Sequence, residues 1–264
     1  MAGTKHLSDT IETSGKHIRL VDGGHLVPTA PSIFDHFAYG AGAFNSHVPQ
    51  NWVTTETGSG TPFAPGATGV TVAIGATGGT TNNGEELAGK LVGWNPSTMD
   101  DMNLVVEARF KTLSATTAAA GDFYFGFADA VTYTNSLPYV ISAASADTTS
   151  VPTEFCGFAY SSIPTSGVLY AASGNNYIGA VTTIANVNTI TASTKQKDSN
   201  YHVYRIELTT GGEAVFYYDG EQVMAVTDAI TANTAFTPYL CAVAKASLVQ
   251  TMTLDYLYVG GSIV

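Results

Sequence analysis

Carboxylates are the first residues to test for chemistry, because two of them about 5 Å apart can act as acid and nucleophile at a glycosidic bond. Glu85 and Glu86 are adjacent, so in a strand they point to opposite faces. Glu107 and Asp255 each stand alone in strand-like runs. The chain has no Gly-x-Ser-x-Gly nucleophile elbow. We therefore interpret these carboxylates as surface charges, predict no catalytic residues and expect the protein not to be an enzyme.

Metal ligands are the second possibility, and histidines crowd the first 50 residues. Their spacings of eleven, eight, eleven and eleven residues match no compact ligand motif. The histidines concerned are His6, His17, His25, His36 and His47. The pairs Asn82–Asn83, Asp100–Asp101 and Asn175–Asn176 are typical of turns, although a calcium-binding loop would use the same residue types. We predict no cofactor and no metal ligand, and a structural calcium ion stays open.

Composition excludes several partner classes. The chain has 264 residues, a net charge of −11 and only ten Lys and Arg, so it lacks the basic stripe that nucleic acid requires. No run approaches the roughly 20 apolar residues that span a bilayer, and the N-terminus lacks the apolar segment of a signal peptide. Charged residues are 12% of the chain, against about 25% on average. This favours a large core together with a subunit interface depleted of charge.

Two cysteines, Cys156 and Cys241, lie in apolar strand-like runs. We predict that both are buried free thiols, which pack as small hydrophobic groups. A single disulfide between them stays open, because spacing alone does not decide pairing.

Residues 201–226 predict a three-stranded antiparallel meander. Tyr204, Ile206 and Leu208 alternate with polar neighbours, and Gly211–Gly212 and Asp219–Gly220 are hairpin turns. Other runs alternate in the same way, and no stretch keeps a helical period. In the last strand the alternation places Met252, Leu254, Tyr256 and Tyr258 on one face. The strands concerned include 52–56, 70–74, 86–94, 103–113, 122–128, 155–160, 168–172, 177–183, 238–244 and 249–259. We predict an all-β, two-sheet antiparallel sandwich over residues 51–264.

Several segments carry a resemblance to the concanavalin A-like, laminin-G-like jelly roll. They are Val-Glu-Ala-Arg-Phe, Phe-Tyr-Phe-Gly-Phe-Ala-Asp, Phe-Cys-Gly-Phe, Tyr-Arg-Ile-Glu-Leu, Phe-Tyr-Tyr-Asp-Gly-Glu-Gln-Val and Leu-Asp-Tyr-Leu-Tyr-Val, between residues 104 and 259. The Glu-x-Asp-x-x-Glu motif of the related laminarinase-like enzymes is absent. In composition and layout the whole chain also resembles lectin-fold virion proteins of tailed bacteriophages.

The second resemblance implies a structural virion protein, a capsid decoration (cement) protein that stabilises the phage head without catalysis. It further implies a homo-oligomer, a trimer by family habit, with the major capsid protein as partner, no nucleic acid or membrane partner, and a location in the virion. The alternative function is a carbohydrate-binding module of a tail fibre or spike, with a glycosidase-like enzyme as a third. The tyrosines proposed for glycan contact are Tyr133, Tyr139, Tyr160 and Tyr170.

Residues 1–50 show no regular hydrophobic periodicity, which indicates an extended arm. Fixing each backbone residue costs roughly 1–2 kcal/mol, and the arm holds too few periodic apolar positions to offset that cost alone. We therefore expect the arm to lie along a neighbouring subunit or the capsid surface. The apolar residues expected at that interface are Ile18, Leu20, Leu26, Ile33, Phe34, Phe37 and Phe44.

Overall fold

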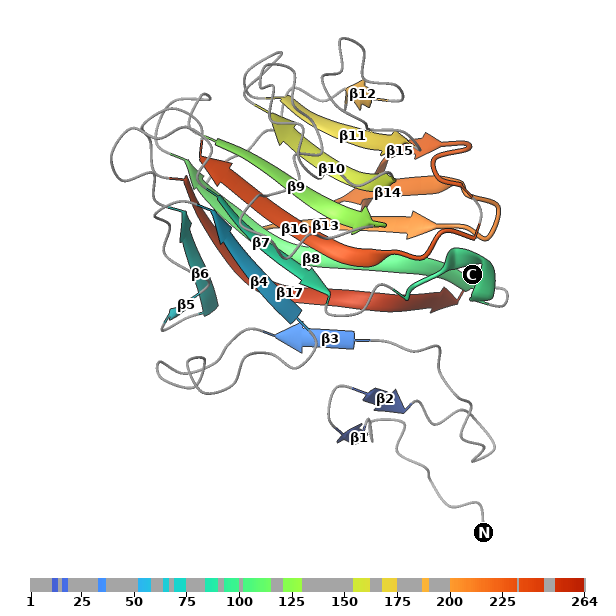
Figure 1. Cartoon of the computed structure of the whole chain (residues 1–264), viewed down its shortest axis with the longest axis horizontal. Coiled ribbons are helices and arrows are strands. Elements are labelled where there is room, and N and C mark those ends of the chain that lie inside the picture. The colour runs from blue at the N-terminus through green and yellow to red at the C-terminus, as the bar shows by residue number, and fades with distance from the viewer. Residues whose placement is uncertain are drawn as a thin grey trace.

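The computed structural model shows a two-sheet β-sandwich (Figure 1). The residues that it describes are 11–13, 16–18, 33–36, 52–57, 64–66, 69–74, 84–89, 93–99, 102–114, 121–129, 154–161, 168–174, 187–189, 200–231, 233–244 and 250–263. Every strand pairing among these residues is antiparallel. The all-β, two-sheet prediction is confirmed.

One sheet has seven strands in the spatial order β12-β11-β10-β9-β16-β7-β4. Their bounds are β12 Val187–Thr189, β11 Val168–Gly174, β10 Phe155–Ser161, β9 Gly121–Ala128, β16 Thr237–Ala244, β7 Gly84–Gly89 and β4 Trp52–Thr57. The predicted strand at 86–94 ends at Gly89, and Trp94 instead forms an isolated bridge with Phe236. The predicted strand at 177–183 lies outside the described residues.

The second sheet has eight strands, seven of them in the order β15-β14-β13-β8-β17-β6-β5, with β3 also paired to β17. Their bounds are β15 Glu221–Val226, β14 Ala214–Tyr218, β13 His202–Leu208, β8 Met102–Ser114, β17 Gln250–Ile263, β6 Gly69–Ile74, β5 Ala64–Gly66 and β3 Ile33–His36. The predicted meander is β13-β14-β15. Its turns use Gly212, Asp219 and Gly220 at positive φ, as the Gly-Gly and Asp-Gly pairs predicted.

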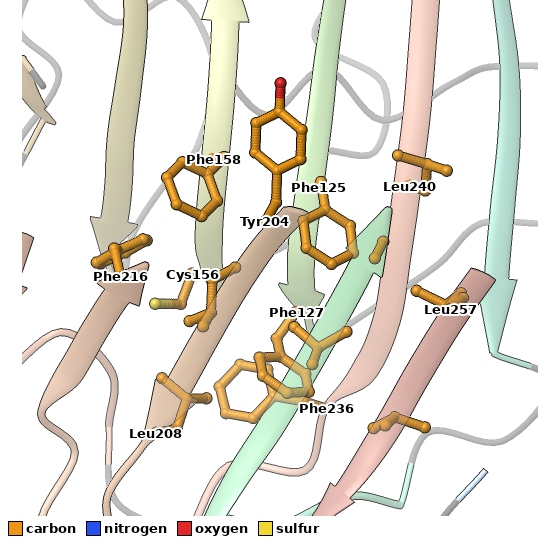
Figure 2. Packing of buried hydrophobic residues seen from close by; sticks show 14 of the residues in the cluster. Phe125, Phe127, Cys156, Phe158, Tyr204, Leu208, Phe216, Phe236, Leu240 and Leu257 are labelled. Atoms are coloured by element: carbon orange, nitrogen blue, oxygen red, sulfur yellow. The ribbon is translucent and has the colours of Figure 1, made fainter. Parts of the chain in front are cut away.

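Aromatic side chains from both sheets fill the space between them (Figure 2). Phe110 of β8 stacks on Tyr204 of β13 with ring centroids 4.3 Å apart, and it meets Phe123 of β9 edge-on at 5.3 Å. Phe158 of β10 likewise meets Phe216 of β14 at 5.3 Å. Edge-to-face pairs are worth about 0.5–1.5 kcal/mol beyond the burial of their area. The Phe110–Phe123 and Phe158–Phe216 contacts cross between the sheets and therefore hold one sheet against the other, whereas the Phe110–Tyr204 stack lies within the eight-stranded sheet.

A bulge in β17 changes which of its residues enter this core. The register with β8 shifts between Leu254 and Tyr256, so Asp255 is the extra residue. Met252 and Leu254 belong to the core before the bulge, and Leu257 and Val259 belong to it afterwards. The prediction that Met252, Leu254, Tyr256 and Tyr258 share one face is therefore wrong, because the bulge moves both tyrosines to the outer face.

The predicted arm contributes strands of its own. β3 pairs with Tyr256–Val259 of β17, and Ile33 packs against the core while remaining partly exposed. Figure 1 shows β3 beside β17, along one margin of the sheet. Two shorter strands, β1 (Ile11–Thr13) and β2 (Lys16–Ile18), pair with each other. Contact between the arm and a neighbouring subunit stays a prediction. The fold also includes one short 3-10 helix, η1 (Pro96–Thr98).

Candidate functional site

The outer face of the eight-stranded sheet gathers tyrosines and charged side chains that the core does not use. We name this set the tyrosine–arginine face. Its members are Tyr201, Arg205, Glu207, Tyr217, Glu107, Arg109, Lys111, Asp255, Tyr256 and Tyr258, all of intermediate exposure. They come from β8, β13, β14 and β17 and from the residue just before β13. Three cations balance three carboxylates, so the face is formally neutral on a chain of net charge −11.

One row of this face crosses four neighbouring strands. Tyr217 of β14 is the register partner of Arg205 of β13, Arg205 is the partner of Glu107 of β8, and Glu107 is the partner of Tyr258 of β17. Strands in a sheet lie 4.7–4.9 Å apart, so the two tyrosines of the row stand roughly 14 Å apart. Arg205 and Glu107 lie between them.

Ion pairs fix the polar groups in the middle of this row. Arg205 binds Glu107 at 3.0 Å and Glu207 at 2.7 Å, and their side chains are between 15% and 27% exposed. The hydroxyl of Tyr256 donates a hydrogen bond of 2.7 Å to the second oxygen of Glu107. Asn103 donates from its amide to the second oxygen of Glu207 at 3.3 Å. The carboxylates are thus held in place before any ligand arrives, which lowers the entropy cost of binding.

The titration behaviour of the row follows from these contacts. Burial lowers the pKa of Arg205, but the hydrogen bonds and charges of Glu207 and Glu107 outweigh it, so the net pKa is raised. Burial, followed by the hydrogen bond to Glu107, raises the pKa of Tyr256. Burial, followed by the charge of Glu207, raises the pKa of Tyr217. The tyrosines therefore stay neutral phenols throughout the physiological pH range. The Tyr256 hydroxyl donates its proton to Glu107 and the Tyr258 hydroxyl donates to the carbonyl oxygen of Gly261, so these two oxygens remain as acceptors for a ligand.

The other end of the face is built around Tyr201. Arg109 pairs with Asp255, the extra residue of the β17 bulge. The guanidinium carbon of Arg109 lies 4.6 Å from the ring centroid of Tyr201, and Lys111 Nζ lies 4.8 Å from the same centroid. Both distances lie within the range of cation–π attraction. Burial and the charge of Asp255 raise the pKa of Tyr201, while Arg109 lowers it.

A different group stands out on the outer face of the seven-stranded sheet. Glu86 of β7 is fully buried, and neither of its carboxylate oxygens has a partner in hydrogen-bond geometry. Burial raises its pKa to about 8, and the neighbouring Tyr239 hydroxyl offsets only part of that shift. The interpretation of Glu86 as a surface charge is therefore wrong. At pH 7 this carboxyl is mostly protonated.

The surroundings of Glu86 explain why it stays neutral. Its register partner is Cys241 of β16, whose partner in turn is Tyr124 of β9, and both side chains are buried. Cys156, in contrast, belongs to the core between the sheets. The two cysteines therefore point to opposite faces, and both are free thiols, as predicted.

Two of the four tyrosines proposed for glycan contact fall on described strands. Tyr160 of β10 has Leu169 as register partner, and Tyr170 of β11 has Ala159. Tyr133 and Tyr139 lie outside the described residues. Their proposed role stays a prediction.

The proposed interface residues divide in the same way. Ile18 lies in β2, and Ile33 and Phe34 lie in β3. The other four, Leu20, Leu26, Phe37 and Phe44, lie outside the described residues.

Sequence reasoning considered only Glu107 and Asp255 of the tyrosine–arginine face and missed its other members as site residues. One signal in the sequence nevertheless predicts part of this face. The aliphatic residues Met252, Leu254, Leu257 and Val259 are spaced by two, three and two positions. The step of three indicates a bulge, which turns the intervening tyrosines to the opposite face. Glu107 and Asp255 were interpreted as isolated surface charges, whereas cross-strand pairing brings each beside an arginine.

Glu86 does not form a glycosidase pair with Glu107 or Glu207. A retaining enzyme needs a protonated acid about 5 Å from an ionised carboxylate. Glu86 carries the raised pKa and belongs to the seven-stranded sheet, whereas Glu107 and Glu207 share Arg205 on the outer face of the other sheet. Packed sheets lie about 10 Å apart, so the two outer faces are farther apart than that. Among the described residues, no three His, Cys, Asp or Glu side chains gather to hold a metal ion, and no helix could cross a membrane.

The architecture defines the class: the chain is a concanavalin A-like jelly-roll sandwich. The carbohydrate recognition domain of Emp47p aligns with a TM-score of 0.57 and 12% identity, covering 90% of this chain and all of that domain. The corresponding domain of Emp46p, in a potassium-bound form, aligns with a TM-score of 0.57 and 9% identity over 85% of this chain and 94% of the other. The β-glucanase of Bacillus licheniformis aligns with a TM-score of 0.51 and 10% identity, covering 86% of this chain and 97% of the glucanase. At such identities the likeness concerns the fold.

No family model matches the sequence, and no curated protein matches it.

Proposed function

We propose that this protein is a non-catalytic carbohydrate-binding sandwich that contacts glycans through the tyrosine–arginine face. The observation that carries the proposal is the row Tyr217–Arg205–Glu107–Tyr258, in which two aromatic rings flank a pre-ordered guanidinium–carboxylate pair. Sugar rings present apolar C–H faces and polar hydroxyl edges. Tyrosine supplies both an apolar ring and a polar hydroxyl, and it costs little conformational entropy when it is fixed.

The likeness to carbohydrate recognition domains supports the same class of ligand. Those domains share the two-sheet fold with this chain, although the low identity means that no individual residue is carried across. The separation of Glu86 from Glu107 and Glu207 on different sheets supports binding without cleavage by these three carboxylates. The proposal therefore combines a fold that hosts sugar binding with a face that has suitable chemistry.

A glycan array probed with the full-length chain tests the proposal. Wild-type protein is expected to bind a reproducible subset of oligosaccharides. Tyr217→Ala should weaken that binding about tenfold, or about 1.4 kcal/mol, whereas Tyr217→Phe keeps the ring and should retain most of it. An array without reproducible binding would refute the proposal, and so would a Tyr217→Ala protein that binds as wild type. Tyr139→Ala is tested in parallel. Binding lost only in Tyr139→Ala would place the glycan site at the four tyrosines predicted from the sequence instead of at the tyrosine–arginine face.

A second candidate is the structural virion role, as a trimeric decoration protein bound to the major capsid protein. The pairing of β3 with β17 favours it, because a segment of the predicted arm completes a sheet by strand addition. An arm that pairs in this way within one chain has the backbone groups to pair with a neighbour. The test is deletion of residues 1–45, which should leave the sandwich folded and abolish oligomers and capsid binding. A full-length protein that stays monomeric at micromolar concentration and has no affinity for capsids would end this candidate.

A further inference from the structure

The two ends of the tyrosine–arginine face carry opposite charge. At the Tyr201 end, Arg109 and Lys111 face a single carboxylate, Asp255. At the other end, Arg205 alone faces Glu107 and Glu207. The formal charges are therefore +1 at the first end and −1 at the second.

Lys111 is the cation that this arrangement leaves available. Its described interaction is the cation–π contact with Tyr201, at 4.8 Å from the ring centroid, and no described carboxylate pairs with it. Arg109, which shares the ring, is already paired with Asp255. A cation held over an aromatic ring keeps a fixed position and retains donor hydrogens for a second partner.

From this charge separation we infer that the face selects acidic glycans, with the sugar carboxylate bound at Lys111 beside Tyr201. This inference rests on the proposed glycan-binding function and names the ligand class for the same face. Lys111 and Glu107 lie four residues apart on β8, roughly 14 Å at 3.4 Å per residue. A carboxylate at the Glu107 end would meet two negative charges. The charge pattern therefore orients an acidic oligosaccharide as well as selecting it.

The size of the preference follows from the partial exposure of the site. An exposed ion pair contributes at most about 1 kcal/mol, equivalent to about fivefold in affinity. The interaction is also screened by salt, since the Debye length is about 8 Å at physiological ionic strength. We therefore expect the preference for the acidic ligand to shrink in 1 M salt.

Calorimetric titration with one oligosaccharide in two charge states tests the inference. The probes are an oligogalacturonate and its methyl ester, which have the same backbone with and without carboxylate charge. Wild type should bind the acid about fivefold more tightly than the ester. Lys111→Gln should abolish that difference, and Lys111→Arg should preserve it. Thr210→Glu, at an exposed turn position, lowers the net charge by the same single unit and should behave as wild type.

The outcomes separate this inference from the function on which it rests. Equal affinity of wild type for acid and ester, or an unchanged preference in Lys111→Gln, overturns the acidic selectivity while glycan binding stands. Binding of neutral array glycans with no binding of either probe also overturns it. Failure of every glycan, acidic and neutral, overturns the proposed function instead. A preference lost equally in Thr210→Glu would show that net charge, not Lys111, is responsible.

Discussion

Replacing Glu86 by glutamine should change how the stability of this protein depends on pH. The carboxyl is fully buried and its pKa is about 8, against 4.5 for an ordinary glutamate. Between these two values the unfolded chain releases the proton while the native protein keeps it. Because the native state then binds more protons, the free energy of unfolding falls as the pH rises from 4.5 to 8.

The magnitude follows from the difference of 3.5 pKa units between the folded value of about 8 and the ordinary value of 4.5. Each unit corresponds to about 1.36 kcal/mol, so the stability lost by pH 8 amounts to about 5 kcal/mol. Below pH 4.5 the carboxyl is protonated in both states and contributes no pH dependence. Above pH 8 it ionises in both states and the penalty stays constant.

Urea unfolding followed by tryptophan fluorescence at pH 5, 6, 7 and 8 measures this effect, since Trp52 is buried. Wild type should lose stability across this range more steeply than Glu86→Gln, whose side chain does not titrate. The pH-dependent loss relative to Glu86→Gln should reach several kcal/mol at pH 8 and fall below about 1 kcal/mol at pH 5. Glu213→Gln, in the turn before β14, is the control and should follow wild type. Parallel curves for wild type and Glu86→Gln would show that this carboxyl is not held neutral by burial.

Three further predictions follow from packing and charge. In Gly157→Ala the new methyl would overlap the backbone of β9, so the variant should lose more than about 2 kcal/mol of stability and its melting temperature should fall accordingly. Gly93→Ala has open space around the new methyl and should melt as wild type. In Arg205→Met two carboxylates lose their shared cation, which should lower the free energy of unfolding by about 1–2 kcal/mol in denaturant titrations, and an unchanged midpoint would contradict the described pairing. Because Cys156 and Cys241 are buried on opposite faces, a thiol reagent should label neither in the native protein and both in urea, with no intramolecular disulfide after oxidation.

The fold could be predicted because its signals are local. The alternation of Tyr204, Ile206 and Leu208 sets the inner face of β13, and all three are buried as that pattern requires. The turns at Gly212 and Asp219–Gly220 follow from residues that accept positive φ. Each of these signals acts within a few residues of the chain, so one sequence is enough to read them.

The tyrosine–arginine face was harder to predict because it depends on registers between strands that are distant in sequence. Arg205 meets Glu107 across 98 positions, and Tyr256 meets Glu107 across 149. A shift of one residue in either pairing would exchange these contacts for others. The bulge at Asp255 produces such a shift within β17, and strict alternation assigned Tyr256 and Tyr258 to the wrong face for this reason.

Period-two alternation predicts which residues share a face of a strand, but it does not predict whether other parts of the protein cover that face. Glu86 and Glu107 both follow this pattern on the outer sides of their sheets, yet Glu86 is fully buried and Glu107 is partly exposed beside an arginine. Burial without a cation raised the pKa of Glu86, whereas Glu107 gained a cation and a phenol as partners. The two carboxylates therefore differ in protonation state and in surroundings, although both lie on outer faces of the same sandwich. Glu86 is a neutral group whose ionisation costs stability, and Glu107 is an ordered hydrogen-bond acceptor on the face that we propose to bind glycans.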